Sequence, residues 1–256
     1  VMAEAFIYDA VRTPRGKGKA TGALYTTRPV ELLAQTLRAV RDRTGLDTAL
    51  VDDVVMGCVT QTLEQGSCIA RTASLQAGYD LDAPGVTVNR FCGSGLEAVN
   101  QAATMVASGF FDCVVAGGVE SMSRVPMGSD GGAIWDVAQQ WAFGSVPQGI
   151  SADLIATMRG FSRTDVDTFA AASQARAQQA IAGGALSRSI VPVTDEGGLV
   201  LLDRDEHPRA GTTVETLSAL RPSFEMMGRQ FGLDTLVRKQ YPQIARVEHV
   251  HTAGNS

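Results

Sequence analysis

The residue whose type and position most clearly indicate a chemical role is Cys92, in the stretch VNRFCGSGLEAVNQAA. An apolar, β-rich run precedes it, and small and apolar residues at helical spacing follow it, so we expect Cys92 at the amino end of a helix. Free N–H groups and the helix dipole there favour a thiolate, the nucleophilic form of cysteine. Gly93 and Gly95 allow a sharp turn and a close approach by backbone or ligand. A buried cysteine in a strand-to-helix turn is the alternative that these local features leave open.

The other cysteines and the histidines offer little further chemistry. The remaining cysteines are Cys58, Cys68 and Cys113, without CxxC spacing, so we expect no zinc or other metal site and no disulfide framework. Free cysteines in apolar segments fit a reducing cytoplasm. The histidines are rare, and we interpret all of them as structural or exposed: His207, His249 and His251.

The composition is that of an ordered globular protein. Among 256 residues, 45% are hydrophobic and 19% charged, enough for a substantial core. The net charge of −5, without a dense basic run, gives no reason to expect nucleic-acid binding. No apolar run approaches membrane-spanning length, and the start lacks the pattern of a secretory signal.

Strands and helices are expected to alternate over residues 1–120, which we assign to an α/β core domain that carries Cys92. The expected strands cover residues 5–11, 51–59, 85–91 and 111–119, and the expected helices cover 30–43, 68–78 and the stretch after Cys92.

Residues 121–256 are assigned to a second domain. Residues 120–151 are rich in Gly, Ser and Met and predict a long structured loop region. A helix is expected after Ser162, which with Asp165 forms an N-capping pattern, and Gly183 with Gly184 predicts its end. SIVPVTDEGGLVLLDRDEH predicts two short strands around a turn, and an irregular piece is expected after ETLSALRPSF.

Several motifs in this chain resemble those of the thiolases, the acyl-CoA C-acyltransferases. They occur in the order of the family: RTPRGKGKATGAL, VNRFCGSGLEAVNQAA, AGGVESMSRVPMG, SRTDVDTFAAASQARAQQA, ALRPSF and HTAGNS. The resemblance implies an α/β thiolase fold of αβαβα layers, in which a loop domain is inserted into the first of two similar core domains. Cys92 would be the nucleophile that accepts the acyl group. ISADLIATMRGFSR most resembles thiolases of bacterial fatty-acid degradation, including subunits of multienzyme β-oxidation complexes.

The resemblance also implies a site for coenzyme A and acyl-CoA in the loop domain. Leu220 and Phe224 would line the pantetheine channel, and ordinary core packing is the alternative for both. Ala253 and Gly254 would let the pantetheine arm pass close to the backbone.

Arg209 and Thr216 would lie near the nucleotide end of coenzyme A, where a guanidinium suits an anionic ligand. A solvated surface charge is the alternative for Arg209. Pro147 and Gln148 stand where biosynthetic thiolases often carry a His-Met pair, which weakens a purely acetoacetyl-CoA assignment.

Three further family motifs do not occur in the 256 residues: Gly-His-Pro, Asn-Glu-Ala-Phe and Cys-x-Gly-Gly-Gly. We therefore expect the front portion of a thiolase, with the second core domain absent, so that the 256 residues alone would be inactive and would need the missing C-terminal domain. The resemblance implies a homodimer or homotetramer once it is complete. A non-catalytic acyl-CoA-binding or scaffold protein is the alternative. A ketosynthase is a third hypothesis. The motifs favour a thiolase over it, in particular NRFCGSG and GGVESMSRVPMG.

Overall fold

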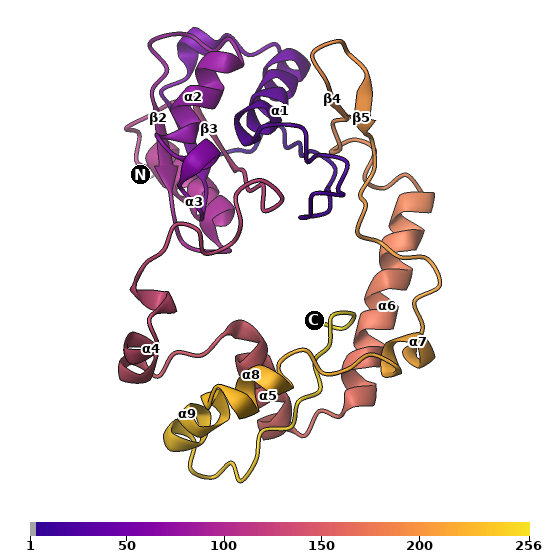
Figure 1. The fold of residues 1–256 in the computed structure, drawn as a ribbon. Helices are drawn as coiled ribbons and strands as arrows, with labels where there is room; N and C mark the ends of the chain where they lie inside the picture. The colour runs from indigo at the N-terminus through magenta and orange to yellow at the C-terminus, as the bar shows by residue number, and fades with distance from the viewer. Residues whose placement is uncertain (1–3) are drawn as a thin grey trace. The chain divides into compact units, whose positions relative to one another are not determined.

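The computed structural model describes residues 4–256, which form two compact units (Figure 1). The first unit comprises the chain up to Asp130 together with Leu186–His207, and the second comprises Gly131–Ala185 and Pro208–Ser256. The sequence placed a single boundary after residue 120. The structure instead returns Leu186–His207 to the first unit, where Val193 packs with Leu24 and the Arg12 guanidinium binds the Asp205 carboxylate through two hydrogen bonds of 2.7 and 2.8 Å.

The first unit is built on a parallel sheet with strand order β2-β1-β3. The strands are β1 (Asp53–Gly57), β2 (Gly85–Val88) and β3 (Val114–Gly118), and the α-helices are α1 (Pro29–Thr44), α2 (Ile69–Gln76) and α3 (Ser94–Ala107). These elements match the expected strands and helices within a few residues. Proline at the first position of α1 and left-handed Gly45 after its last explain where that helix begins and ends.

The two faces of central strand β1 contact different helices. Val54 and Met56 point into the core with Leu33 of α1 and Ile69 of α2. Successive side chains alternate across a strand, so Gly57 belongs to the opposite face. There it meets the first turn of α3. The sheet is therefore covered on both faces, as buried parallel strands require.

The strand expected at residues 5–11 does not form. Phe6, Ile7 and Tyr8 are 68, 78 and 92% exposed. The first pairing along the described chain is at Arg12, which forms a parallel bridge with Ile190. A strand needs a neighbour to complete its ladder of hydrogen bonds, and nothing within residues 4–256 supplies one here.

The two expected short strands form an antiparallel pair, β4 (Val193–Thr194) and β5 (Val200–Leu202). Asp195 closes the turn between them, because its carboxylate accepts hydrogen bonds from the Gly197 and Leu199 amides. Val193 is completely buried among apolar side chains of the first unit.

The described part of the second unit is helical. Its α-helices are α4 (Val137–Phe143), α5 (Gln148–Arg159), α6 (Arg163–Ala182), α7 (Val214–Ser218), α8 (Glu225–Gln230) and α9 (Leu233–Gln240). It also contains the 3₁₀ turn Ala133–Trp135, while the first unit contains the 3₁₀ turns Thr48–Leu50 and Leu63–Gln65. The Ser162–Asp165 capping box and the end of α6 at Gly183 confirm the sequence prediction. None of the helices within residues 4–256 is long and apolar enough to cross a membrane.

Three helices of this unit correct the sequence analysis. Helix α4 lies within the expected loop region, and α8 and α9 replace the expected irregular piece. Helices this short are stable only through contacts with the rest of the protein. In α9, Leu233 and Val237 pack with Ile150 and Leu154 of α5.

Candidate active site

Cys92 lies on an exposed turn between β2 and α3. Helix α3 begins at Ser94 with Gly93 as its N-cap, so Cys92 precedes the first helical residue by two positions. Phe91, immediately before it, has a left-handed φ of 47° and is 59% exposed. A non-glycine residue in this region signals a backbone held by its surroundings. The turn therefore presents the Cys92 thiol to solvent at the carboxyl end of the parallel sheet.

Two polar side chains hold this turn in shape. The Ser94 hydroxyl accepts a hydrogen bond from the Arg90 amide at 2.9 Å and donates to the Phe91 carbonyl at 2.5 Å. The Asn89 carboxamide accepts from the Phe91 amide at 2.8 Å and donates to the Val59 carbonyl at 3.0 Å. Asn89 thus fixes the residue before Cys92 and ties the turn to the segment after β1.

Glycines allow the strand ends and the helix to approach closely. A Cβ atom at Gly57 would lie 2.3 Å from the Ser94 carbonyl carbon and 2.6 Å from the Gly95 nitrogen. A Cβ atom at Gly118 would lie 2.7 Å from the Gly57 carbonyl oxygen. Real Cβ atoms do not come so near to backbone, so both positions require glycine. The sequence had singled out Gly93 and Gly95, but a Cβ atom at Gly57 would come closer to its neighbours than one at either of these.

The other cysteines are in different environments. Burial, followed by the negative charge of Glu120, raises the pKa of the Cys58 thiol to about 12. Burial also raises the pKa of Cys113, and the nearby Asp52 carboxylate adds to this effect. Cys68 is exposed, and its sulfur lies 3.3 Å from the Gly85 carbonyl oxygen. Cys92 and Cys68 are therefore the exposed cysteines of residues 4–256, whereas burial raises the pKa of the other two thiols.

In the second unit, the segments that carry Leu220 and Gly254 run side by side. Pro222 and Thr252 form an antiparallel bridge, and the Ser223 amide donates to the His251 carbonyl at 2.9 Å. A Cβ atom at Gly254 would lie 2.7 Å from Leu220 Cδ1, so the structure brings these predicted pantetheine contacts together. Ala253, between Thr252 and Gly254, is exposed.

The other predicted contacts in this unit are spread over several elements. Phe224 is partly buried, and a Cβ atom at Gly149 would lie 2.2 Å from its ring. Thr216 lies in α7, where its hydroxyl donates to the Thr213 carbonyl. Arg209 is exposed, and its amide donates to the Gln174 side chain at 2.9 Å.

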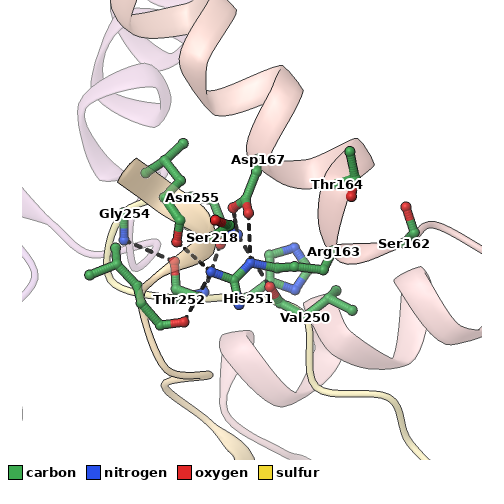
Figure 2. Close-up of polar contacts among 12 residues, drawn as sticks. Ser162, Arg163, Thr164, Asp167, Ser218, Val250, His251, Thr252, Gly254 and Asn255 are labelled. Atoms are coloured by element: carbon green, nitrogen blue, oxygen red, sulfur yellow. Dashed lines mark hydrogen bonds and ion pairs between the residues drawn. The ribbon is translucent and has the colours of Figure 1, made fainter. Parts of the chain in front are cut away.

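Helix α6 supplies a polar support that the sequence analysis missed (Figure 2). The completely buried Asp167 carboxylate binds Arg163 Nε at 2.8 Å and Asn255 Nδ2 at 2.6 Å. Arg163, Asp167 and Gln174 share one helical face, since steps of four and seven residues return to nearly the same angle. In the sequence this spacing resembles an ordinary solvated face, and only the structure shows that Asp167 is buried.

The histidines have structural partners, in agreement with the sequence interpretation. His249 lies between two carboxylates, with Nδ1 2.7 Å from Asp153 Oδ2 and Nε2 3.1 Å from Asp234 Oδ2. His251 Nδ1 lies 2.8 Å from Asp153 Oδ1. His207 is exposed, and its ring lies 3.2 Å from the Gly16 carbonyl oxygen. Within residues 4–256, no group of three or more acidic, histidine or cysteine side chains could hold a metal ion.

The family model of the thiolase N-terminal domain matches residues 5–230, a range that includes the Cys92 turn and helix α6. The chain belongs to the thiolase family. Similar curated proteins are the 3-ketoacyl-CoA thiolases of Shewanella denitrificans, 40% identical over 228 residues, and of Pseudoalteromonas translucida, 42% identical over 231 residues.

This thiolase chain spans only part of the length of its relatives. The two alignments cover 88 and 87% of the chain but 59 and 58% of the relatives. A solved structure, the Bacillus anthracis acetyl-CoA acetyltransferase, superposes with a TM-score of 0.75 at 32% identity, covering 88% of this chain and 60% of that one. The expected α/β thiolase fold is therefore confirmed for the N-terminal domain of the family.

Proposed function

We propose that this chain provides the acyl-accepting cysteine and part of the coenzyme A site of an acyl-CoA C-acyltransferase that cleaves 3-ketoacyl-CoA. The observation that carries the proposal is the exposed Cys92 on a held turn at the amino end of α3, within the region that matches the thiolase domain. In open α/β sheets, ligands bind at the carboxyl ends of the strands, and Cys92 lies there.

The chemistry is a transfer in two steps. The Cys92 thiolate forms a bond to the keto carbon of the substrate, the adjacent carbon–carbon bond breaks, and the departing acetyl-CoA takes the electron pair and a proton. The thiol of a second coenzyme A loses its proton, which balances the one taken up by acetyl-CoA, and its sulfur attacks the resulting thioester and releases the shortened acyl-CoA as Cys92 recovers its thiolate. Such a covalent intermediate divides one difficult step into two easier ones and gives ping-pong kinetics.

The second unit would hold coenzyme A. Leu220, Phe224, Ala253 and Gly254 would contact the pantetheine arm, while Arg209 and Thr216 would lie near the anionic nucleotide end. The proposal also includes assembly into a homodimer or homotetramer, association with a β-oxidation multienzyme complex and a cytoplasmic location. These further points rest on the resemblance of the motifs to the thiolases and, for the location, on the free cysteines.

Intact-protein mass spectrometry after brief exposure to a 3-ketoacyl-CoA tests the proposal. In a form completed by the second core domain, we expect an added acyl mass that is absent from Cys92→Ala and retained in Cys68→Ala, a matched variant of the other exposed cysteine. An adduct that survives in Cys92→Ala would disprove the nucleophile assignment. Binding of coenzyme A without any adduct would favour the alternative, a non-catalytic acyl-CoA-binding protein.

A further inference from the structure

We infer that Asp167 is the positioning residue that holds the two walls of the proposed pantetheine site, residues 217–220 and 250–255, in a fixed position relative to each other. This role rests on the proposed function. Its carboxylate is completely buried, and each of its two oxygens has a different partner (Figure 2). Oδ2 accepts from Arg163 at 2.8 Å, and Oδ1 accepts from Asn255 at 2.6 Å. Each of these partners is also hydrogen-bonded to the backbone of a segment that carries predicted coenzyme A contacts.

Arg163 connects Asp167 to the first wall. One of its terminal nitrogens donates to the Leu217 carbonyl at 2.5 Å and to the Leu220 carbonyl at 3.0 Å. These carbonyls belong to the end of α7 and the turn after it. The fork of the guanidinium therefore fixes the backbone from which Leu220 projects.

Asn255 connects Asp167 to the second wall. Its Nδ2 also lies 3.2 Å from the Val250 carbonyl, and its Oδ1 accepts from the Thr252 amide at 2.6 Å. The Asn255 carboxamide thus closes the loop that presents Ala253 and Gly254. One carboxylate on α6 consequently determines where two segments, distant in sequence, lie with respect to each other.

The negative charge of Asp167 is essential to this arrangement. Both partners present N–H donors, and a carboxylate offers acceptors only. In Asp167→Asn one acceptor becomes an NH₂ group that must face either the guanidinium or the Asn255 amide, so one of the two connections is lost. Buried networks tolerate such a mismatch poorly. The nucleotide end has separate support, because the Arg209 backbone is held by Gln174.

Titration calorimetry with two ligands tests this role on the full 256-residue chain. Coenzyme A reports on both ends of the site, whereas adenosine 3′,5′-bisphosphate lacks the pantetheine arm. We expect Asp167→Asn to weaken coenzyme A binding about tenfold and to leave adenosine 3′,5′-bisphosphate binding unchanged, since about one hydrogen bond to a charged group is lost. A general loss of stability would lower both affinities together.

Asp165→Asn is the matched control. Asp165 lies on the same helix, but its carboxylate serves the exposed capping box with Ser162. It should lower stability without changing the affinity for either ligand. Should Asp167→Asn not fold, the affinities of Arg163→Lys for the two ligands test the same role. This variant keeps the positive charge beside Asp167 and loses the guanidinium nitrogen that donates to the Leu217 and Leu220 carbonyls.

The outcomes separate the two proposals. If the unmodified chain binds coenzyme A and neither Asp167→Asn nor Arg163→Lys changes that affinity relative to adenosine 3′,5′-bisphosphate, Asp167 has no positioning role. If the unmodified chain binds neither ligand, the proposed coenzyme A site itself is wrong, and the role of Asp167 is overturned with it.

Discussion

Gly57 at the end of β1 lies directly against Ser94, the first residue of α3, so closely that a Cβ atom at Gly57 would come within 2.3 Å of the Ser94 carbonyl carbon. The three nearest atoms, the carbonyl carbon and oxygen of Ser94 and the nitrogen of Gly95, all belong to backbone, so none can move as the end of a flexible side chain would. The position of α3, and of Cys92 before it, is therefore determined by the absence of a side chain on the neighbouring strand.

Gly57→Ala should destabilise the first unit and displace the amino end of α3, because the new methyl group overlaps the backbone of α3. We expect a loss of about 2 kcal/mol or more in the free energy of unfolding, measured with urea. Gly95→Ala is the control: its Cβ would lie 4.0 Å from the nearest atom, the Gly117 oxygen, and alanine favours a helix. Equal stabilities of the two variants would contradict the steric argument.

Asn89→Ala should release the Phe91 amide and the Val59 carbonyl. We expect a loss of about 1–3 kcal/mol in unfolding free energy, because two hydrogen bonds disappear. The left-handed conformation of Phe91 should also relax, which changes the rate at which iodoacetamide modifies Cys92. Asn100→Ala, on the exposed face of α3, should change neither quantity. An unaltered rate in a destabilised Asn89→Ala protein would show that Asn89 supports the fold without shaping the turn.

Iodoacetamide should modify Cys92 faster than Cys58 or Cys113 in the folded chain, because only the thiolate reacts and burial holds the pKa of the latter two up. Peptide mass spectrometry over time measures each rate. Since burial, with the charge of Glu120, raises the pKa of Cys58 to about 12, Cys58 should remain unreactive even at about pH 9 while the protein stays folded. Comparable rates at the three cysteines would remove the case for an activated Cys92.

Asp205 should make the stability of the first unit depend on acid pH. Its hydrogen bonds with Arg12 lower its pKa, so the ionised form stabilises the folded state above the ordinary aspartate range and this contribution disappears as the pH falls. Asp205→Asn should cost about 1–3 kcal/mol near pH 7 and less near pH 3.

Urea unfolding at the two pH values measures the effect of Asp205→Asn. Asp203→Asn, an exposed carboxylate of the same segment, should stay within about 0.5 kcal/mol of the original protein at both. The interpretation fails if the cost of Asp205→Asn is the same at the two pH values.

The sequence by itself determined the features that depend on local patterns. Apolar runs between helical patterns predicted β1, β2 and β3 in their places, and the Ser162–Asp165 spacing predicted the start of α6. The position of Cys92 before a helix followed from the same reasoning. Motifs in a fixed order indicated the thiolase family, which the match over residues 5–230 confirms.

Only the tertiary structure decided features that depend on partners distant in sequence. Residues 5–11 have the composition of a strand but no neighbouring strand within the described chain, whereas α9 forms because Leu233 and Val237 pack on α5. Asp167 has the spacing of a surface residue, yet it is buried against Asn255, 88 positions later. Local periodicity records which face of an element is apolar, but the partner of a buried charge exists only once the chain has folded.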